Sequence, residues 1–180
     1  SDPMDPQTLA ALLWACQGVT ARQGPYQLRT APSAGALYPF ETYLILNRVE
    51  GMEPGLAHFD PATFSLRRLK TGDLSESLVE GCLRQRFLAW APVVFVWTAV
   101  MERCAWKYGA RATRYVGLDL GHVCGNLVTA ASALGLGSCA VGAFLDQPMN
   151  ELLGVDGEEE YVFYLASAGL PRKPGTDEQP

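Results

Sequence analysis

The sequence predicts an α+β fold in which helices cover a mixed sheet. Strand-like and helix-like segments alternate irregularly, and residues 92–100 (PVVFVWTAV) are apolar on both faces, as in a central, fully covered strand. A chain of 180 residues, 48% of them hydrophobic, is typical of one domain with a buried core. We expect a single domain over residues 5–171, a polar tail over 172–180 and a cloning remnant at 1–3.

The first helix is predicted from its ends. Asp5 can accept the free amides of the first turn, Pro6 suits the first helical position, and Gly18 ends the apolar pattern. Residues 19–29 are a polar, turn-rich connection, and residues 30–39 (TAPSAGALYP) form a loop of small residues between two prolines.

The other elements follow from apolar periodicity and turn residues. In chain order they are a strand at 41–46, a hairpin at 55–69, a helix at 73–83, the central strand at 92–100, a charged and aromatic segment at 102–114, a helix at 113–134, a strand at 138–141, a helix at 148–153 and a strand at 160–168.

Composition and motifs exclude several classes of protein. A net charge of −5 without a basic stripe argues against nucleic-acid binding, and no apolar run approaches the about 20 residues that span a membrane. The five cysteines lack C-x-x-C spacing, which predicts buried free thiols in a reducing compartment. Two histidines cannot form a His-rich metal site, and we expect no metal. With no signal peptide pattern, the expected location is the cytoplasm.

The long helix carries three glycines on one face, Gly117, Gly121 and Gly125. Each costs about 1 kcal/mol relative to alanine, so a close approach must offset them. A second subunit, a flat ligand or tight packing within the chain could supply it. His122 lies on an adjacent face, where a hydrogen-bonded core or interface residue is favoured over a catalytic base.

Two loops of small residues are the other unusual features. One covers residues 33–36 and the other residues 135–143, and such loops let backbone amides approach a planar ring or a phosphate. Together with residues 106–108 (WKY) they indicate a pocket with backbone donors, a cation and a phenol. An isoalloxazine ring suits such a pocket, because charge that develops on the ring needs a cation or an amide dipole.

These segments, in this order, resemble the nitroreductase superfamily and its SagB-type dehydrogenase branch. The resemblance covers residues 8–171, and the segments that carry it are APSAGALYP at 31–39, KYG at 107–109 with Arg111, Arg114 and Tyr115, GHV at 121–123 with NL at 126–127, and ALGLG at 133–137 followed by Gly142. The branch includes flavin enzymes that oxidise thiazolines and oxazolines in modified peptides.

The resemblance implies a three-layer fold, with a central, mostly antiparallel sheet flanked by helices, and a homodimer that binds FMN at the subunit interface. It places the flavin against Ser33, Ala34 and Gly35 and against Ala140, Val141 and Gly142. A Lys-Tyr pair is tied to azoline dehydrogenation, and Lys107 and Tyr108 match it. Basic residues after the last strand, here Arg172 and Lys173, reach the flavin phosphate. The helix with Gly117, Gly121 and Gly125 fits the dimer interface.

The sequence also departs from this family. Members normally open with an Arg-Arg-Ser-x-Arg segment that clamps the FMN phosphate, whereas this sequence starts at the helix that follows it. Losing a bidentate arginine costs on the order of 2–4 kcal/mol of binding. Arg29, four residues before Ser33, is a candidate to compensate, as is Arg22.

Two functions follow from the sequence. One is an FMN-dependent oxidoreductase that moves a hydride between flavin and a small or peptide-derived substrate, with Lys107 as base or charge partner and Tyr108 as proton donor or orienting group. Azoline dehydrogenation is one such reaction, and NAD(P)H is a candidate electron donor. The other is a shortened, non-catalytic homologue that acts as a dimeric flavin-binding or assembly subunit. In that case Lys107 is a surface lysine and Tyr108 a core or interface aromatic.

Overall fold

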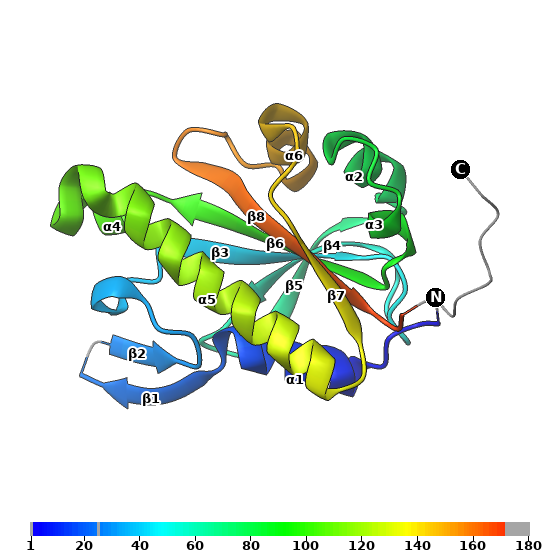
Figure 1. Ribbon diagram of the computed structural model, residues 1–180, viewed down its shortest axis with the longest axis horizontal. Helices are drawn as coiled ribbons and strands as arrows, with labels where there is room; N and C mark the ends of the chain where they lie inside the picture. The colour runs from blue at the N-terminus through cyan, green and yellow to red at the C-terminus, as the bar shows by residue number, and fades with distance from the viewer. Residues whose placement is uncertain (1, 25, 172–180) are drawn as a thin grey trace.

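The computed structural model describes residues 2–24 and 26–171. Its centre is a six-stranded sheet in the order β5-β4-β3-β6-β8-β7, and all pairings between neighbouring strands are antiparallel (Figure 1). The predicted α+β fold with a mostly antiparallel sheet is confirmed. The strands are β3 (Phe40–Leu46), β4 (Gly55–Asp60), β5 (Ser65–Thr71), β6 (Val93–Val100), β7 (Gly137–Val141) and β8 (Glu160–Gly169).

Helices cover both faces of this sheet, which gives three layers. One face packs against α1 (Pro6–Gln17) and α5 (Ala112–Ala133), and α5 crosses the strands diagonally (Figure 1). The opposite face packs against the shorter helices α2 (Ser75–Gly81), α3 (Phe87–Trp90) and α6 (Asp146–Leu153).

β6 lies between β3 and β8 and is buried on both faces, as its sequence predicts. Phe95 and Trp97 belong to the core under α1 and α5, whereas Val94 and Val96 belong to the core under the shorter helices. Each such side chain contributes about 1.5–3 kcal/mol through burial, so this strand anchors both cores.

The predicted cap of α1 is present. Asp5 Oδ1 accepts hydrogen bonds from the backbone N–H of Gln7 at 2.9 Å and of Thr8 at 3.0 Å, and the helix ends before Gly18. The other predicted helices and strands begin or end within one or two residues of their predicted bounds.

Three features differ from the prediction. β1 (Val19–Gln23) and β2 (Tyr26–Arg29) form a two-stranded ribbon where a polar connection was predicted, α3 has no counterpart in the predicted elements, and α4 (Glu102–Tyr108) is a helix where only a charged and aromatic segment was predicted. Most residues of β1 are exposed, so the ribbon buries no apolar face and leaves no alternation in the sequence. The ribbon contacts the small-residue loop, which contains the 3-10 turn η1 (Ala34–Ala36).

The cysteines are free thiols. Four of them are buried, as predicted, and Cys139 is exposed on the edge strand β7. Within the described part of the chain, no helix is long and apolar enough to cross a membrane.

Candidate functional site

Gly35 marks the place where two separate segments of the chain meet. Its backbone has φ +65°, and a Cβ atom at this position would lie 2.6 Å from Lys107 Nζ and 2.9 Å from Tyr108 OH. The positive φ favours glycine here, and a Cβ would force the end of the Lys107 side chain and the Tyr108 hydroxyl to shift. The small-residue loop and the Lys-Tyr pair, predicted to share a pocket, therefore lie against each other.

The helix α4 (Glu102–Tyr108) positions the Lys-Tyr pair. Lys107 is exposed, with Nζ 5.5 Å from the centroid of the Tyr108 ring. The ring of Tyr108 is half-buried and packs on Tyr115 of α5, with 4.4 Å between centroids. The phenol is thus held by a neighbouring ring, while the ammonium group is on a flexible stem.

A buried carboxylate that sequence reasoning missed lies beneath the loop. Asp119, on the inner face of α5, accepts a hydrogen bond from Ser33 Oγ at 2.5 Å and one from the Ala34 N–H at 3.1 Å. Burial raises the pKa of this carboxyl, and the hydrogen bonds from Ser33 and Ala34 act in the opposite direction. The sequence offers only a weak signal for it, an aspartate with Val116 and Val123 one helical turn before and after it.

A second missed residue, Glu41 at the start of β3, connects α4 to the sheet. Its Oε1 lies 2.5 Å from Arg103 Nη1, and its Oε2 lies 2.8 Å from His58 Nε2. Burial raises the pKa of Glu41, but the contacts with His58 and Arg103 outweigh burial, so the pKa is lowered. Arg103 precedes Lys107 by one helical turn, so this ion pair fixes the helix that carries the Lys-Tyr pair.

Arg29 lies between α1 and the loop. Its Nη1 donates to Gln17 Oε1 at 2.6 Å, its guanidinium stacks 4.3 Å from the centroid of the Tyr38 ring, and its backbone N–H donates to Tyr38 OH. Within the described residues Nε is buried without a hydrogen-bond partner, so part of the guanidinium is uncommitted. Arg172 and Lys173, the other predicted phosphate ligands, lie outside the described residues.

The segment from Ala140 to Gly142 forms the end of β7 and the residue after it. Ala140 and Gly142 are exposed, Val141 is buried, and a Cβ at Gly142 would lie 4.0 Å from the Tyr164 ring. This end of β7 is at the same end of the sheet as the loop before β3, but three strand spacings away, or roughly 14 Å. Within one chain the two small-residue segments are therefore separate.

The groups at Gly35 suit a flat ring that carries partial negative charge. Gly35 is exposed and has no side chain, while Lys107 and Tyr108 supply an ammonium and a phenol beside it. The Ser33 hydroxyl and the Ala34 N–H donate to Asp119 of α5 and so support the loop, and their contact with a flavin stays a prediction. The residues present fit a flavin ring at this position.

The outward face of α5 is open at two of its glycines. A Cβ at Gly121 or Gly125 would meet nothing within 4 Å, and a Cβ at Gly117 would lie 3.9 Å from Phe163. Tight packing within the chain therefore does not explain these glycines. His122, on the adjacent face, is exposed.

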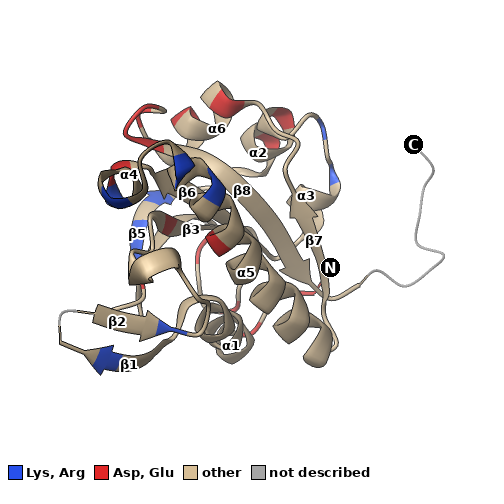
Figure 2. Cartoon of the chain, turned by 60° about the vertical axis from the view of Figure 1, so that its left-hand side comes forward, with Lys and Arg blue, Asp and Glu red and all other residues tan. Residues whose placement is uncertain are grey.

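The charges are unevenly distributed over the molecule. Figure 2 shows Lys and Arg on α4 and the first turns of α5, whereas Asp and Glu mark α2, α6 and the loop before β8. The bulky Trp106 lies within this basic region and is 73% exposed. Among the described residues, no cluster of His, Cys, Asp or Glu is placed to hold a metal ion.

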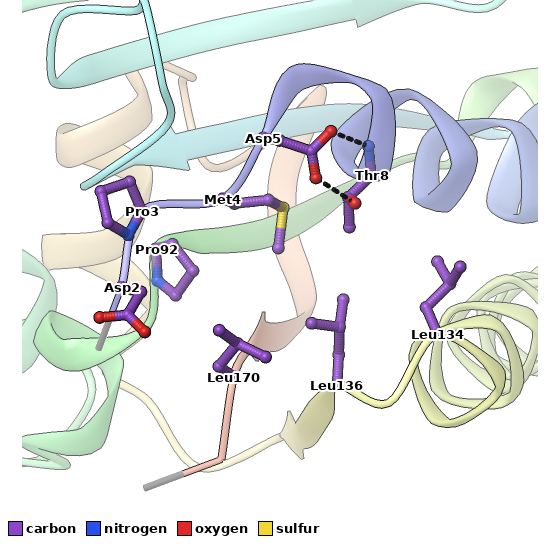
Figure 3. Close-up of a pocket in the computed structure, with 9 residues that line it drawn as sticks. All are labelled: Asp2, Pro3, Met4, Asp5, Thr8, Pro92, Leu134, Leu136 and Leu170. Carbon is purple, nitrogen blue, oxygen red and sulfur yellow. Dashed lines mark hydrogen bonds between the residues drawn. The ribbon is translucent and has the colours of Figure 1, made fainter.

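A pocket of about 200 Å³ lies elsewhere, between the amino-terminal segment and the ends of α5 and β8 (Figure 3). Asp5 is occupied as the cap of α1, and the rest of the lining is mainly apolar. None of the predicted site residues belongs to this pocket. Its lining residues are Asp2, Pro3, Met4, Asp5, Thr8, Pro92, Leu134, Leu136 and Leu170.

Comparisons with known proteins agree with this geometry. The family model described as the nitroreductase family matches residues 1–169. MJ1384 of Methanocaldococcus jannaschii, provisionally named a nitroreductase, is 37% identical over 169 residues, which are 94% of this chain and 82% of that protein.

Solved structures share the fold. A provisionally named nitroreductase from Anabaena variabilis has a TM-score of 0.85 and 34% identity over 90% of this chain, but the match spans only 34% of the Anabaena chain. A chain of the E. coli microcin synthetase McbBCD complex, solved with truncated pro-MccB17 bound, has a TM-score of 0.83 and 21% identity, over 96% of this chain and 66% of that one. The match across nearly all of the sequence places the chain in the nitroreductase family.

Proposed function

We propose that the chain is an FMN-dependent oxidoreductase that transfers a hydride between flavin and a small or peptide-derived substrate. The observation that carries this proposal is the contact of Gly35 with Lys107 Nζ and Tyr108 OH. FMN, when bound, supplies a hydride acceptor and donor at its ring. The proposed ring contacts are the loop at Gly35 of one copy and, because the two segments are roughly 14 Å apart within one chain, the segment of Ala140, Val141 and Gly142 in the second copy of a dimer.

The proposed roles of the side chains follow from their positions. Lys107 holds a positive charge beside the loop and serves as base or charge partner, and Tyr108 donates or orients a proton. Ser33 and Ala34 hold the loop in place. Arg29, Arg172 and Lys173 are proposed to contact the phosphate through their cationic groups.

Azoline dehydrogenation of a modified peptide, as in the SagB-type branch, is the reaction that we favour. The Lys-Tyr pair supports it, as does the likeness in fold to a chain of the microcin synthetase complex that was solved with a propeptide bound. NAD(P)H is the alternative electron source, in which case the substrate is reduced.

We further propose that the outward face of α5 pairs with a second copy of the chain. Gly121 and Gly125 leave space for a neighbouring backbone, and Leu118 and Val128 on the same face are 54% and 38% exposed. Small residues flanked by exposed apolar ones are typical of a close helix contact.

The direct test of cofactor binding is a visible absorption spectrum of the purified protein, before and after addition of FMN and desalting. We expect flavin bands that correspond to about one FMN per chain. A protein that stays colourless and gains no thermal stability from FMN would contradict the proposal. It would favour the non-catalytic assembly subunit, a role that the microcin synthetase complex also suggests.

The Lys-Tyr pair is tested by substitution. Lys107→Met keeps the apolar stem and removes the charge, so we expect FMN to remain bound while turnover falls by about a hundredfold or more. Tyr108→Phe keeps the ring packed on Tyr115 and removes the hydroxyl, and we expect turnover to fall in this variant as well. Arg86→Gln, which removes an exposed cation elsewhere, is the matched control and leaves turnover unchanged. Equal turnover in all three variants would exclude Lys107 and Tyr108 from catalysis.

A further inference from the structure

The loop that contains Gly35 is tied to α5 by a single carboxylate. Asp119 is only 4% exposed, and Ser33, 86 positions away in the sequence, donates to it from Oγ at 2.5 Å. The Ala34 N–H donates to the same group at 3.1 Å. Within the described residues Asp119 has no ion pair, and its charge is stabilised first by these two donors and, to a smaller extent, by the electrostatic influence of His122.

The same hydroxyl fixes the far end of the loop. Ser33 Oγ accepts a hydrogen bond from the Tyr38 N–H at 2.9 Å while it donates to Asp119. One hydroxyl therefore joins the first and last residues of the loop to the helix. Because both ends are held, Gly35 between them has little freedom to move along the surface of α4.

The position of Gly35 determines its distance to two side-chain groups of α4. Lys107 Nζ and Tyr108 OH lie so close to its backbone that an added Cβ would be 2.6 and 2.9 Å from them. A shift of the loop changes both contacts at once. Misplacement by about 1 Å costs on the order of a hundredfold in rate where reacting groups must be aligned.

We propose that Asp119 is the positioning residue of this site, acting through Ser33 and Ala34 to hold Gly35 against Lys107 and Tyr108. It touches neither the expected substrate nor the expected cofactor. The effect of Asp119 on catalysis rests on the proposed function. Its restraint of the loop, here called the hold on the loop, rests only on the hydrogen bonds that Ser33 and Ala34 donate to it.

The hold is measured first in flavin-free protein, by hydrogen exchange of the backbone amides of residues 33–38. Asp119→Asn replaces the charged acceptor with a neutral amide whose one oxygen must accept from both Ser33 and Ala34, and because hydrogen bonds to a charged acceptor are the stronger ones we expect the Ala34 amide to exchange at least tenfold faster. Ser33→Ala removes the hydroxyl and is expected to release the Tyr38 amide as well. Ser33→Thr keeps the hydroxyl in an extended backbone conformation and should restore slow exchange.

Asp156→Asn is the matched control. Asp156 also accepts several backbone amides, those of Glu158, Glu159 and Glu160, but in the loop before β8. It should leave the exchange of residues 33–38 unchanged.

The catalytic consequence is measured in FMN-loaded protein. For Asp119→Asn and Ser33→Ala we expect kcat to fall tenfold or more with KM changed less than threefold, together with an altered flavin absorption spectrum. Ser33→Thr should return both kcat and the spectrum to those of the unsubstituted protein. A loss of stability alone would not produce this spectroscopic change or its reversal by a hydroxyl.

The outcomes separate the two proposals. Unchanged exchange in both Asp119→Asn and Ser33→Ala would overturn the positioning role, as would faster exchange with unchanged kcat and spectrum in the loaded protein. If the unsubstituted protein takes up no FMN, the proposed function fails and the exchange rates alone decide the hold on the loop. If Asp119→Asn does not fold, the comparison of Ser33→Ala with Ser33→Thr tests the positioning role on its own.

Discussion

Among single residues, Glu41 is notable because it connects the sheet to α4, the helix that carries the Lys-Tyr pair. Its two oxygens contact Arg103 and His58 while the side chain remains about four-fifths buried. Glu41→Gln removes the charge that both partners face, and we expect a loss of about 2 kcal/mol of unfolding free energy. Urea unfolding at neutral pH measures this, with Glu80→Gln, an exposed glutamate, as the control of equal charge.

The stabilisation by Glu41 depends on pH in a defined direction. Its pKa is lowered in the folded chain, so its contribution is complete above the ordinary value of 4.5 and is lost as the pH falls through the folded value. The stability difference between the unsubstituted protein and Glu41→Gln should therefore shrink on acidification. A difference that is constant with pH would contradict the lowered pKa.

The residues of the site differ in how far the sequence predicts them. Gly35, Lys107 and Tyr108 belong to short segments whose composition is unusual in itself, and the structure brings them together. Asp119 and Glu41 are ordinary acidic residues in the sequence. Their importance comes from partners that only folding brings near, such as Ser33 at 86 positions, and no local pattern contains such a contact.

At the scale of elements, alanine substitutions at the glycines of α5 distinguish an isolated chain from one that packs on a second copy. For an isolated chain, Gly121→Ala and Gly125→Ala should each stabilise the helix by about 0.5–1 kcal/mol, because the added Cβ meets open space. If a second copy packs on this face, the same changes should weaken the dimer and lower the melting temperature. Sedimentation and thermal unfolding at several protein concentrations distinguish these results.

Gly117→Ala is the control for this comparison. Its Cβ would make an ordinary contact with Phe163 at 3.9 Å within the chain, so it changes helix propensity without projecting into the open space. Stabilisation by all three alanine variants, with a monomer at every concentration, would contradict the proposed dimer face.

The elements themselves were predicted where burial imposes a pattern. β6 is apolar on both faces because both are covered, and α1 is bounded by Asp5 and Gly18. The ribbon of β1 and β2 was missed because its exposed residues have no apolar side to alternate. The short α3 contains a single turn, which is too short for helical periodicity to be visible.

For the whole molecule, the proposed cofactor should be visible as added stability. FMN at a hundred times its Kd is expected to add about 2.7 kcal/mol, or roughly 5–10 °C in Tm for a chain of this size. Riboflavin, which lacks the phosphate, is the informative comparison. A smaller shift with riboflavin supports the proposed phosphate contacts of Arg29, Arg172 and Lys173, and equal shifts would contradict them.

The exposed Trp106 has an optical consequence. It is adjacent in sequence to Lys107, and its indole is 73% exposed, whereas Trp97 is completely buried. Indole emission overlaps the near-ultraviolet absorption of oxidised flavin, so a flavin at Gly35 should quench Trp106 by energy transfer. Reduction lowers the flavin's near-ultraviolet absorption as well as its visible band and so weakens that overlap. The emission of the chain's four tryptophans, and of Trp106 in particular, can therefore report both the occupancy and the redox state of the site without any label.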